Sequence, residues 1–127
     1  MVKVILIVDD SPIARKMLKN SIIKYKEFDI IEAVNGQDGV DKYTANKPDL
    51  TFMDLTMPVM NGYEALQKIK EIDKDSLVIV LTADIQPKSL ASVMALGAFT
   101  VIKKPAKPES IQTIIEKAEL KLKAMRG

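Results

Sequence analysis

Residues 50–62 read LTFMDLTMPVMNG: a bulky apolar run leads to a single acid, Asp54, and the chain then turns at Pro58. A short apolar run that ends in turn residues is typical of a strand buried on both faces of a parallel sheet. The carboxylate at its end would then lie at the edge of the sheet. The question is which other residues meet Asp54 at that edge.

Four more short apolar runs occur along the chain, at 4–8, 29–33, 77–81 and 99–102. Segments with a helical period lie between and after them, at 12–26, 36–46, 62–72, 86–96 and from about 108 onward. In the first helix we expect the buried stripe to be Ile13, Met17, Leu18 and Ile22. The strict alternation predicts an α/β fold, a doubly wound (βα)5 flavodoxin-like three-layer sandwich with a five-stranded parallel sheet in the order 2-1-3-4-5.

Length and composition limit the classes of protein to which this chain can belong. The 127 residues are 47% hydrophobic and 28% charged, so we expect a single domain spanning 1–127 with no output domain. A net charge of +2 gives no reason to expect nucleic acid as a partner. The apolar runs are too short for a membrane span or a signal peptide, which predicts a cytoplasmic protein without a membrane partner. The sequence has no cysteine and no histidine, which excludes disulfides and a histidine base.

Polar residues follow the apolar runs where the strands should end. They are Asp9, Asp10, Asp54, Thr82, Lys103 and Lys104. The carboxyl ends of parallel strands share one edge of a sheet, and open α/β sheets bind their ligands there. Strands 1 and 3 are neighbours in the predicted order, so we expect Asp9, Asp10 and Asp54 to meet.

Three acids at one point repel each other. Two charges about 5 Å apart cost about 3 kcal/mol at an effective dielectric of about 20. Protonation of one acid or a bound cation would relieve this, and an all-oxygen site favours Mg²⁺. Each residue alone also has a simpler explanation: Asp9 or Asp10 could cap the following helix. Asp54 could be a turn residue, Thr82 a β-former and Lys104 a solvated lysine.

A carboxylate beside Mg²⁺ can also be a nucleophile that forms an aspartyl phosphate. Mg²⁺, a lysine ammonium and a hydroxyl would neutralise the charge on the phosphoryl oxygens. The sequence offers no evident base for fast hydrolysis afterwards. This combination favours a switch over an enzyme with turnover.

Four motifs together resemble the receiver domains of bacterial two-component response regulators, over the whole chain. The motifs are Asp9-Asp10, the segment 54–62, Thr82-Ala83 and Lys104-Pro105. The resemblance implies a signalling switch that accepts a phosphoryl group from a sensor histidine kinase and then binds a downstream protein. Stand-alone chemotaxis regulators, which act on the flagellar motor switch, and phosphorelay carriers are both of this kind. A dedicated phosphatase is a further implied partner.

The resemblance also implies roles for single residues, with Asp54 as the phosphoacceptor. The implied Mg²⁺ ligands are Asp9, Asp10, Asp54 and the main-chain carbonyl of Thr56. Thr82 and Lys104 would each bind a phosphoryl oxygen. Lys104 is preferred to Lys103 because it directly precedes Pro105, and the bond between Lys104 and Pro105 is a candidate cis peptide.

Two positions depart from the pattern of the family. Val101 stands where the family often has an aromatic residue whose rotamer reports phosphorylation, and strand alternation would place Phe99 on the same face. Ala106 stands where a large apolar residue commonly follows the Lys-Pro pair. Both positions adjoin the last two strand–helix units, so we expect an unusual partner contact.

An alternative function is that of a Mg²⁺-dependent phosphatase acting through an aspartyl phosphate. Haloacid dehalogenase-type phosphatases place nucleophile and acid two residues apart after the first strand, whereas here Asp9 and Asp10 are adjacent and Asp54 follows the third. An FMN-binding module would need a Gly-, Ser- or Thr-rich loop after the first strand, where this chain has two acids. We therefore expect no enzyme beyond self-phosphorylation from a donor and slow autodephosphorylation.

Overall fold

The computed structural model describes residues 2–126 as strands and helices in strict alternation. The strands are β1 (Val4–Val8), β2 (Asp29–Ala33), β3 (Leu50–Asp54), β4 (Val78–Thr82) and β5 (Thr100–Lys103). The helices are α1 (Pro12–Tyr25), α2 (Gly36–Asn46), α3 (Gly62–Ile72), α4 (Pro87–Ala95) and α5 (Pro108–Arg126). Every predicted element is present, and the ends differ from the prediction by a single residue at most.

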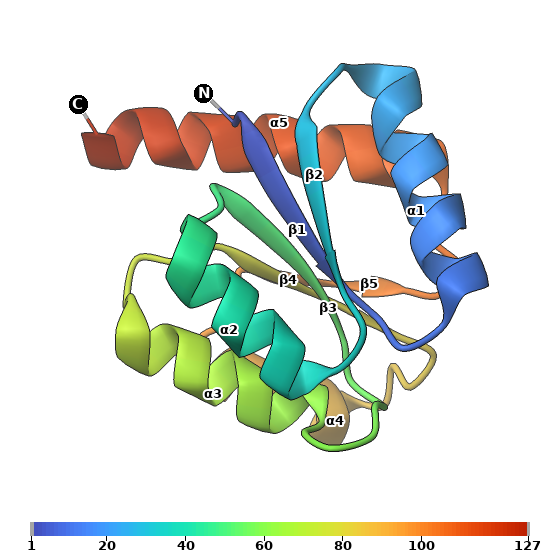
Figure 1. Ribbon diagram of the computed structural model, residues 1–127, viewed down its shortest axis with the longest axis vertical. Coiled ribbons are helices and arrows are strands. Elements are labelled where there is room, and N and C mark those ends of the chain that lie inside the picture. The colour runs from blue at the N-terminus through green and yellow to red at the C-terminus, as the bar shows by residue number, and fades with distance from the viewer. Residues whose placement is uncertain (1, 127) are drawn as a thin grey trace.

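The strands form one parallel sheet in the order β2-β1-β3-β4-β5, as predicted. Helices α1 and α5 cover one face and α2, α3 and α4 cover the other, which gives the three layers seen in Figure 1. The register pairs Val8 of β1 with Met53 of β3. The residues that come next, Asp9 and Asp54, therefore follow at neighbouring positions of the same sheet edge.

The central strands are buried on both faces, which explains their unbroken apolar runs. Every residue of β3 and β4 is buried. Phe52 and Ile79 pack into the core under α1 and α5, whereas Met53 and Val80 pack into the core under α2, α3 and α4. Because successive side chains anchor opposite cores, the strands are held rigidly and the polar residues at their ends are fixed in space.

Polar side chains cap the first three helices. Ser11, Asn35 and Asn61 each accept a hydrogen bond from a main-chain N–H in the first turn of the helix that follows. Such a cap satisfies an N–H that the helix itself leaves unpaired. Because Ser11 caps α1, the alternative that Asp9 or Asp10 is the helix cap is wrong. Asp9 instead accepts a hydrogen bond from the main-chain N–H of Ser11, at 2.9 Å.

The buried stripe of α1 differs from the prediction. Leu18 and Ile22 are buried as expected, but Ile13 and Met17 are 73% and 58% exposed. The side chain of Arg15 is only 14% exposed. Because an α-helix has 3.6 residues per turn, position 15 shares a face with Leu18, whereas positions 13 and 17 point away from it. The helix has therefore turned a charged side chain inward and two apolar ones outward.

Phe99 and Val101 lie on opposite faces of the sheet, contrary to the prediction. Phe99 packs against the core under α1 and α5, and Val101 packs against the other core. The alternation of side chains holds only within a strand, and β5 begins after Phe99, at Thr100. Phe99 therefore does not replace an aromatic residue at position 101.

The last helix, α5, packs one apolar stripe onto the sheet. Its buried residues are Ile111, Ile114, Ile115, Ala118 and Leu122. These are the residues that its helical period predicts. Among the helices between residues 2 and 126, none is both long enough and apolar enough to cross a membrane.

Candidate functional site

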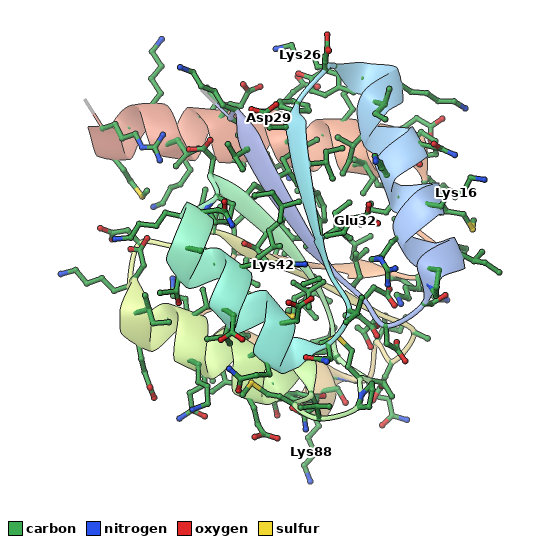
Figure 2. The ribbon with its side chains drawn as sticks, viewed as in Figure 1. Lys16, Lys26, Asp29, Glu32, Lys42 and Lys88 are labelled. Atoms are coloured by element: carbon green, nitrogen blue, oxygen red, sulfur yellow. The ribbon has the colours of Figure 1, made fainter. Side chains whose placement is uncertain are left out.

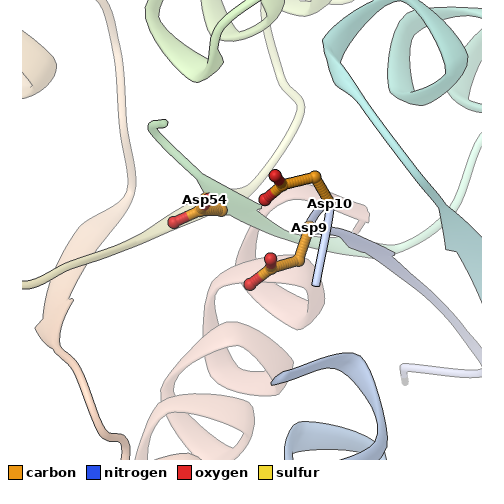
Figure 3. Close-up of side chains that lie close together, drawn as sticks. All are labelled: Asp9, Asp10 and Asp54. Atoms are coloured by element: carbon orange, nitrogen blue, oxygen red, sulfur yellow. The ribbon is translucent and has the colours of Figure 1, made fainter. Parts of the chain in front are cut away.

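Three carboxylates meet at the carboxyl edge of the sheet. Asp9 and Asp10 follow β1, and Asp54 is the last residue of the neighbouring strand β3. One carboxylate oxygen from each lies within 4.8 Å of the other two (Figure 3). Asp9 and Asp54 are buried, and Asp10 is exposed. The structure thus brings together the acids that the sequence placed at one edge.

Lys104 is the cation that faces this cluster. Its Nζ lies 2.9 Å from Oδ2 of Asp9 and 2.8 Å from Oδ1 of Asp54. The neighbouring Lys103 is exposed. The peptide bond between Lys104 and Pro105 is cis, as predicted. Of the two lysines after the last apolar run, Lys104 is therefore the one that contacts the acids.

For both Asp54 and Lys104, burial shifts the pKa in one direction and the contact between the two side chains shifts it in the other. Burial raises the pKa of Asp54, the hydrogen bond from Lys104 lowers it and the nearby Asp9 raises it again, so that the pKa lies above its usual value. Burial lowers the pKa of Lys104, but its hydrogen bonds to Asp54 and Asp9 more than offset this and the pKa is raised. Within residues 2–126 the Lys104 ammonium forms ion pairs with Asp9 and Asp54 but with no oxygen of Asp10, so the cluster keeps an excess of negative charge.

The donor set fits a hard divalent cation. Three carboxylate oxygens lie close enough together to contact one ion. The chain has no histidine or cysteine to add a softer ligand, and oxygen-only sites suit ions such as Mg²⁺. A bound cation would also neutralise the excess charge. The cluster can therefore hold a metal ion, and Thr56 lies close by in the loop that follows Asp54.

Thr82, the last residue of β4, is linked to the start of α4. Its Oγ1 accepts a hydrogen bond from the main-chain N–H of Asp84 at 3.0 Å, which leaves the hydroxyl proton available to donate. The Asp84 carboxylate accepts hydrogen bonds from the Ser89 hydroxyl at 2.6 Å and the Gln86 N–H at 3.0 Å. These two hydrogen bonds hold the pKa of Asp84 below its usual value. A short series of hydrogen bonds thus runs from Thr82 to the first turn of α4.

The loop after β3 turns the chain away from Asp54. Met57 and Met60 are buried and pack into the core under α2, α3 and α4. Between them Val59 is 83% exposed and has φ 67°, in the left-handed region that a β-branched residue rarely adopts. The buried side chains of Met57 and Met60 anchor the loop on either side of this strained residue.

Gly62, the first residue of α3, packs directly against the main chain at the end of β3. Its N–H donates a hydrogen bond to the carbonyl of Leu55 at 2.9 Å. A Cβ atom at this position would lie 2.1 Å from the carbonyl oxygen of Asp54 and 2.7 Å from the Cα of Leu55. Helix α3 therefore begins directly against the peptide group of Asp54, at a distance that only glycine allows.

Replacing Gly62 by alanine should destabilise the folded chain by about 3 kcal/mol, because main-chain atoms of β3 cannot move aside without displacing Asp54. Gly39→Ala is the matched control. There a Cβ would meet the methyl carbons of Val8 at 2.9 Å, and alanine also favours the helix, so we expect a smaller loss. Urea unfolding measures both changes. A Gly62→Ala protein as stable as wild type would contradict the close approach.

A cavity of about 590 Å³ opens beside the acids. Its walls come from α1 and from the loop after β5, and they include Met17, Leu18 and Ala106. Asp9 and Lys104 also line it. The small side chain of Ala106 leaves open a space that a larger apolar residue would partly fill. The cavity thus extends to Asp9 and Lys104 from the side of α1.

Arg15 was not predicted as a site residue, but its guanidinium contacts the site from α1. Its Nη1 donates a hydrogen bond to the main-chain carbonyl of Asp9 at 2.7 Å. The signal was its position three residues before Leu18, on the buried face of the helix. A charged side chain there needs a partner, because burying an unpaired charge is costly.

A family model described as the response regulator receiver domain matches residues 5–116. The chain belongs to this family. The receiver domain is similar to the chemotaxis protein CheY of Thermotoga maritima, with 39% identity over 115 residues that cover 91% of this chain and 96% of that protein. It is also similar to CheY of Bacillus subtilis, with 38% identity over 113 residues that cover 89% and 94%.

Among solved structures, the receiver domain is similar to the CheX-CheY-BeF3-Mg+2 complex from Borrelia burgdorferi. The TM-score is 0.87 and the identity 31%, over 92% of this chain and 89% of that one. The predicted family and flavodoxin-like fold are thereby confirmed. As a receiver domain, the chain is a phosphorylation-activated signalling switch. The roles of its single residues remain predictions.

Proposed function

We propose that this receiver domain accepts a phosphoryl group on Asp54 and signals in chemotaxis by binding another protein. The observation that carries the proposal is the meeting of Asp9, Asp10 and Asp54 with Lys104 at one edge of the sheet. The similarity to relatives named chemotaxis protein CheY, over nearly their whole length, supports the pathway. It also supports residues 1–127 acting as one receiver domain.

In the proposed reaction a carboxylate oxygen of Asp54 attacks the phosphorus of the donor. A P–O bond forms, the bond from phosphorus to the donor atom breaks, and its electron pair leaves with the donor. Lys104 and the hydroxyl of Thr82 each bind a phosphoryl oxygen. A bound Mg²⁺ would neutralise charge on the phosphoryl group. Its proposed ligands are the carboxylates of Asp9, Asp10 and Asp54 and the carbonyl of Thr56.

The proposed partners are other proteins. The phosphodonor is a phosphohistidine of a sensor kinase, and the downstream target is a protein such as the flagellar motor switch. The solved complex of CheX with CheY from Borrelia burgdorferi supports a further protein partner, which we propose to be a dedicated phosphatase. The domain acts in the cytoplasm as a switch and carries out no catalytic turnover on other substrates.

Phosphorylation is proposed to reach the partner-binding surface through Thr82. When the Thr82 hydroxyl moves to the phosphoryl group, its hydrogen bond from the Asp84 N–H is stretched or lost. Asp84 holds the first turn of α4 through Gln86 and Ser89. This route works without an aromatic residue at Val101, because it uses hydrogen bonds to the helix start.

The test is incubation with acetyl phosphate, with Mg²⁺ or with EDTA, followed by intact mass and peptide mapping after borohydride trapping. We expect one added phosphoryl group, formed only with Mg²⁺ and located in the peptide that contains Asp54. The absence of an adduct, or an adduct in another peptide, would overturn the proposal. Sustained release of phosphate over many turnovers would instead favour the Mg²⁺-dependent phosphatase.

A further inference from the structure

The guanidinium of Arg15 joins the sheet edge to α1 beneath the carboxylate cluster. Its Nη1 donates to the carbonyl of Asp9 at 2.7 Å, and its Nε donates to Oε1 of Glu32 at 3.1 Å. The three residues come from the loop after β1, from α1 and from β2. A single planar side chain, 14% exposed, therefore connects three elements.

The main chain of Asp9 is held from both sides. Its N–H donates to the carbonyl of Ala33 at 3.1 Å, which continues the pairing of β1 with β2. Its carbonyl accepts the hydrogen bond from Arg15. This carbonyl belongs to the peptide group that links Asp9 to Asp10, so its orientation sets the direction in which Asp10 leaves the main chain. Within residues 2–126 the Asp10 carboxylate accepts no hydrogen bond, so no side-chain contact of this kind holds it in place.

Glu32 in turn holds Arg15 in place. It lies on β2 on the side of α1, and Lys42 approaches the same strand from α2 (Figure 2). Lys42 donates from Nζ to the main-chain carbonyl of Glu32 at 2.6 Å, and Lys19 lies 3.8 Å from its carboxylate. Lys42 thus holds the main chain of Glu32 and Lys19 lies near its carboxylate, which leaves Oε1 oriented to accept the hydrogen bond from the Arg15 Nε–H.

We propose that Arg15, oriented by Glu32, is a positioning residue for the metal-binding acids of this receiver domain. It fixes the peptide between Asp9 and Asp10 so that both carboxylates point toward Asp54. The inference rests on the proposed Mg²⁺ site. Lysine cannot replace arginine here, because one ammonium lacks the planar fork that reaches two acceptors in fixed directions.

The charge of Arg15 and its geometry predict opposite effects on Mg²⁺ binding. If Arg15 acted only as a nearby positive charge, its removal would make Mg²⁺ bind more tightly. If it positions the acids, its removal makes Mg²⁺ bind more weakly. Outer residues that orient metal ligands typically contribute about 10- to 100-fold in affinity, and we expect a loss at the lower end, about 10-fold.

The experiment is calorimetric titration of Mg²⁺ into wild type, Arg15→Gln, Arg15→Lys and Glu32→Ala. All three variants should bind Mg²⁺ about 10-fold more weakly. Lys16→Gln is the control, because it removes one positive charge from the exposed face of the same helix. The Mg²⁺ affinity of this variant should match that of wild type. Urea unfolding checks that each protein is folded. If Arg15→Gln does not fold, Arg15→Lys still decides the question, because it keeps the positive charge and changes only the geometry.

A second measurement separates positioning from general damage. The rate of phosphorylation by acetyl phosphate is followed against Mg²⁺ concentration. Misplaced acids should raise the Mg²⁺ concentration needed for half the maximal rate, with recovery at saturating Mg²⁺. Wild-type affinity in both Arg15→Lys and Glu32→Ala, or tighter binding in Arg15→Gln, would overturn the inference while the proposed function stands. Failure of wild type to bind Mg²⁺ would overturn both.

Discussion

Replacement of Asp54 by asparagine should abolish the Mg²⁺-dependent phosphoryl adduct and at the same time stabilise the folded chain. The amide is not a nucleophile for phosphorus, so no transfer is expected. The stability gain follows from the charges, because the carboxylates of Asp9, Asp10 and Asp54 converge and, among the described residues, only Lys104 forms an ion pair with them. Removing one negative charge relieves repulsion of about 1 to 3 kcal/mol, and the amide oxygen can still accept a hydrogen bond from Lys104.

The raised pKa of Asp54 also predicts that Asp54→Asn stabilises the folded chain. Burial raises this pKa in the folded chain, so ionising Asp54 costs stability once the pH exceeds the ordinary value of about 4. Asparagine carries no charge and avoids this cost at neutral pH. Such a gain in stability on removing a functional residue is common at active sites.

Intact mass and urea unfolding in EDTA measure the two effects of Asp54→Asn. Asp41→Asn is the matched control, because it makes the same chemical change at an exposed position of α2. The control should form the adduct like wild type and show a smaller change in stability. An adduct on Asp54→Asn at the wild-type level would move the phosphoacceptor elsewhere, and a clear loss of stability would contradict the account of repulsion.

Replacement of Lys104 by methionine should slow phosphorylation by about 10²- to 10³-fold, the range for losing one charged or hydrogen-bonding donor from a transition state. Lys104 Nζ already lies within 3 Å of carboxylate oxygens of both Asp9 and Asp54, so it can reach a phosphoryl group on Asp54 with little movement. Methionine keeps the length and the apolar part of the side chain. The rate constant with acetyl phosphate at saturating Mg²⁺ measures the effect.

Lys103→Met is the control for this experiment. Lys103 is the adjacent residue and carries the same charge, but it is exposed at the end of β5. Its replacement should leave the rate within about twofold of wild type, because exposed charges are well screened by solvent. Equal losses in both variants would mean that the overall charge of this loop matters and that the contact of Lys104 with the acids does not.

Much of the candidate site could be predicted because its residues end apolar strands. Asp54, Thr82 and Asp9 each follow a run that must be buried, and parallel strands bring their carboxyl ends to one edge. The choice of Lys104 over Lys103 also came from the sequence, through Pro105. Arg15 was not predicted because it does not follow an apolar run, and because the group that it contacts at the site is a main-chain carbonyl, which has no signature in the sequence.

The sequence by itself determined the alternation of strands and helices, the parallel sheet and the edge at which the acids meet. Local periodicity suffices for this, because it reports which side chains must leave water. Only the tertiary structure decided that Arg15 turns inward while Ile13 and Met17 turn outward, and that α3 begins against the peptide of Asp54 at Gly62. The rotation of a helix about its axis and the approach of two backbones depend on contacts between distant segments, and a local pattern carries no record of those contacts.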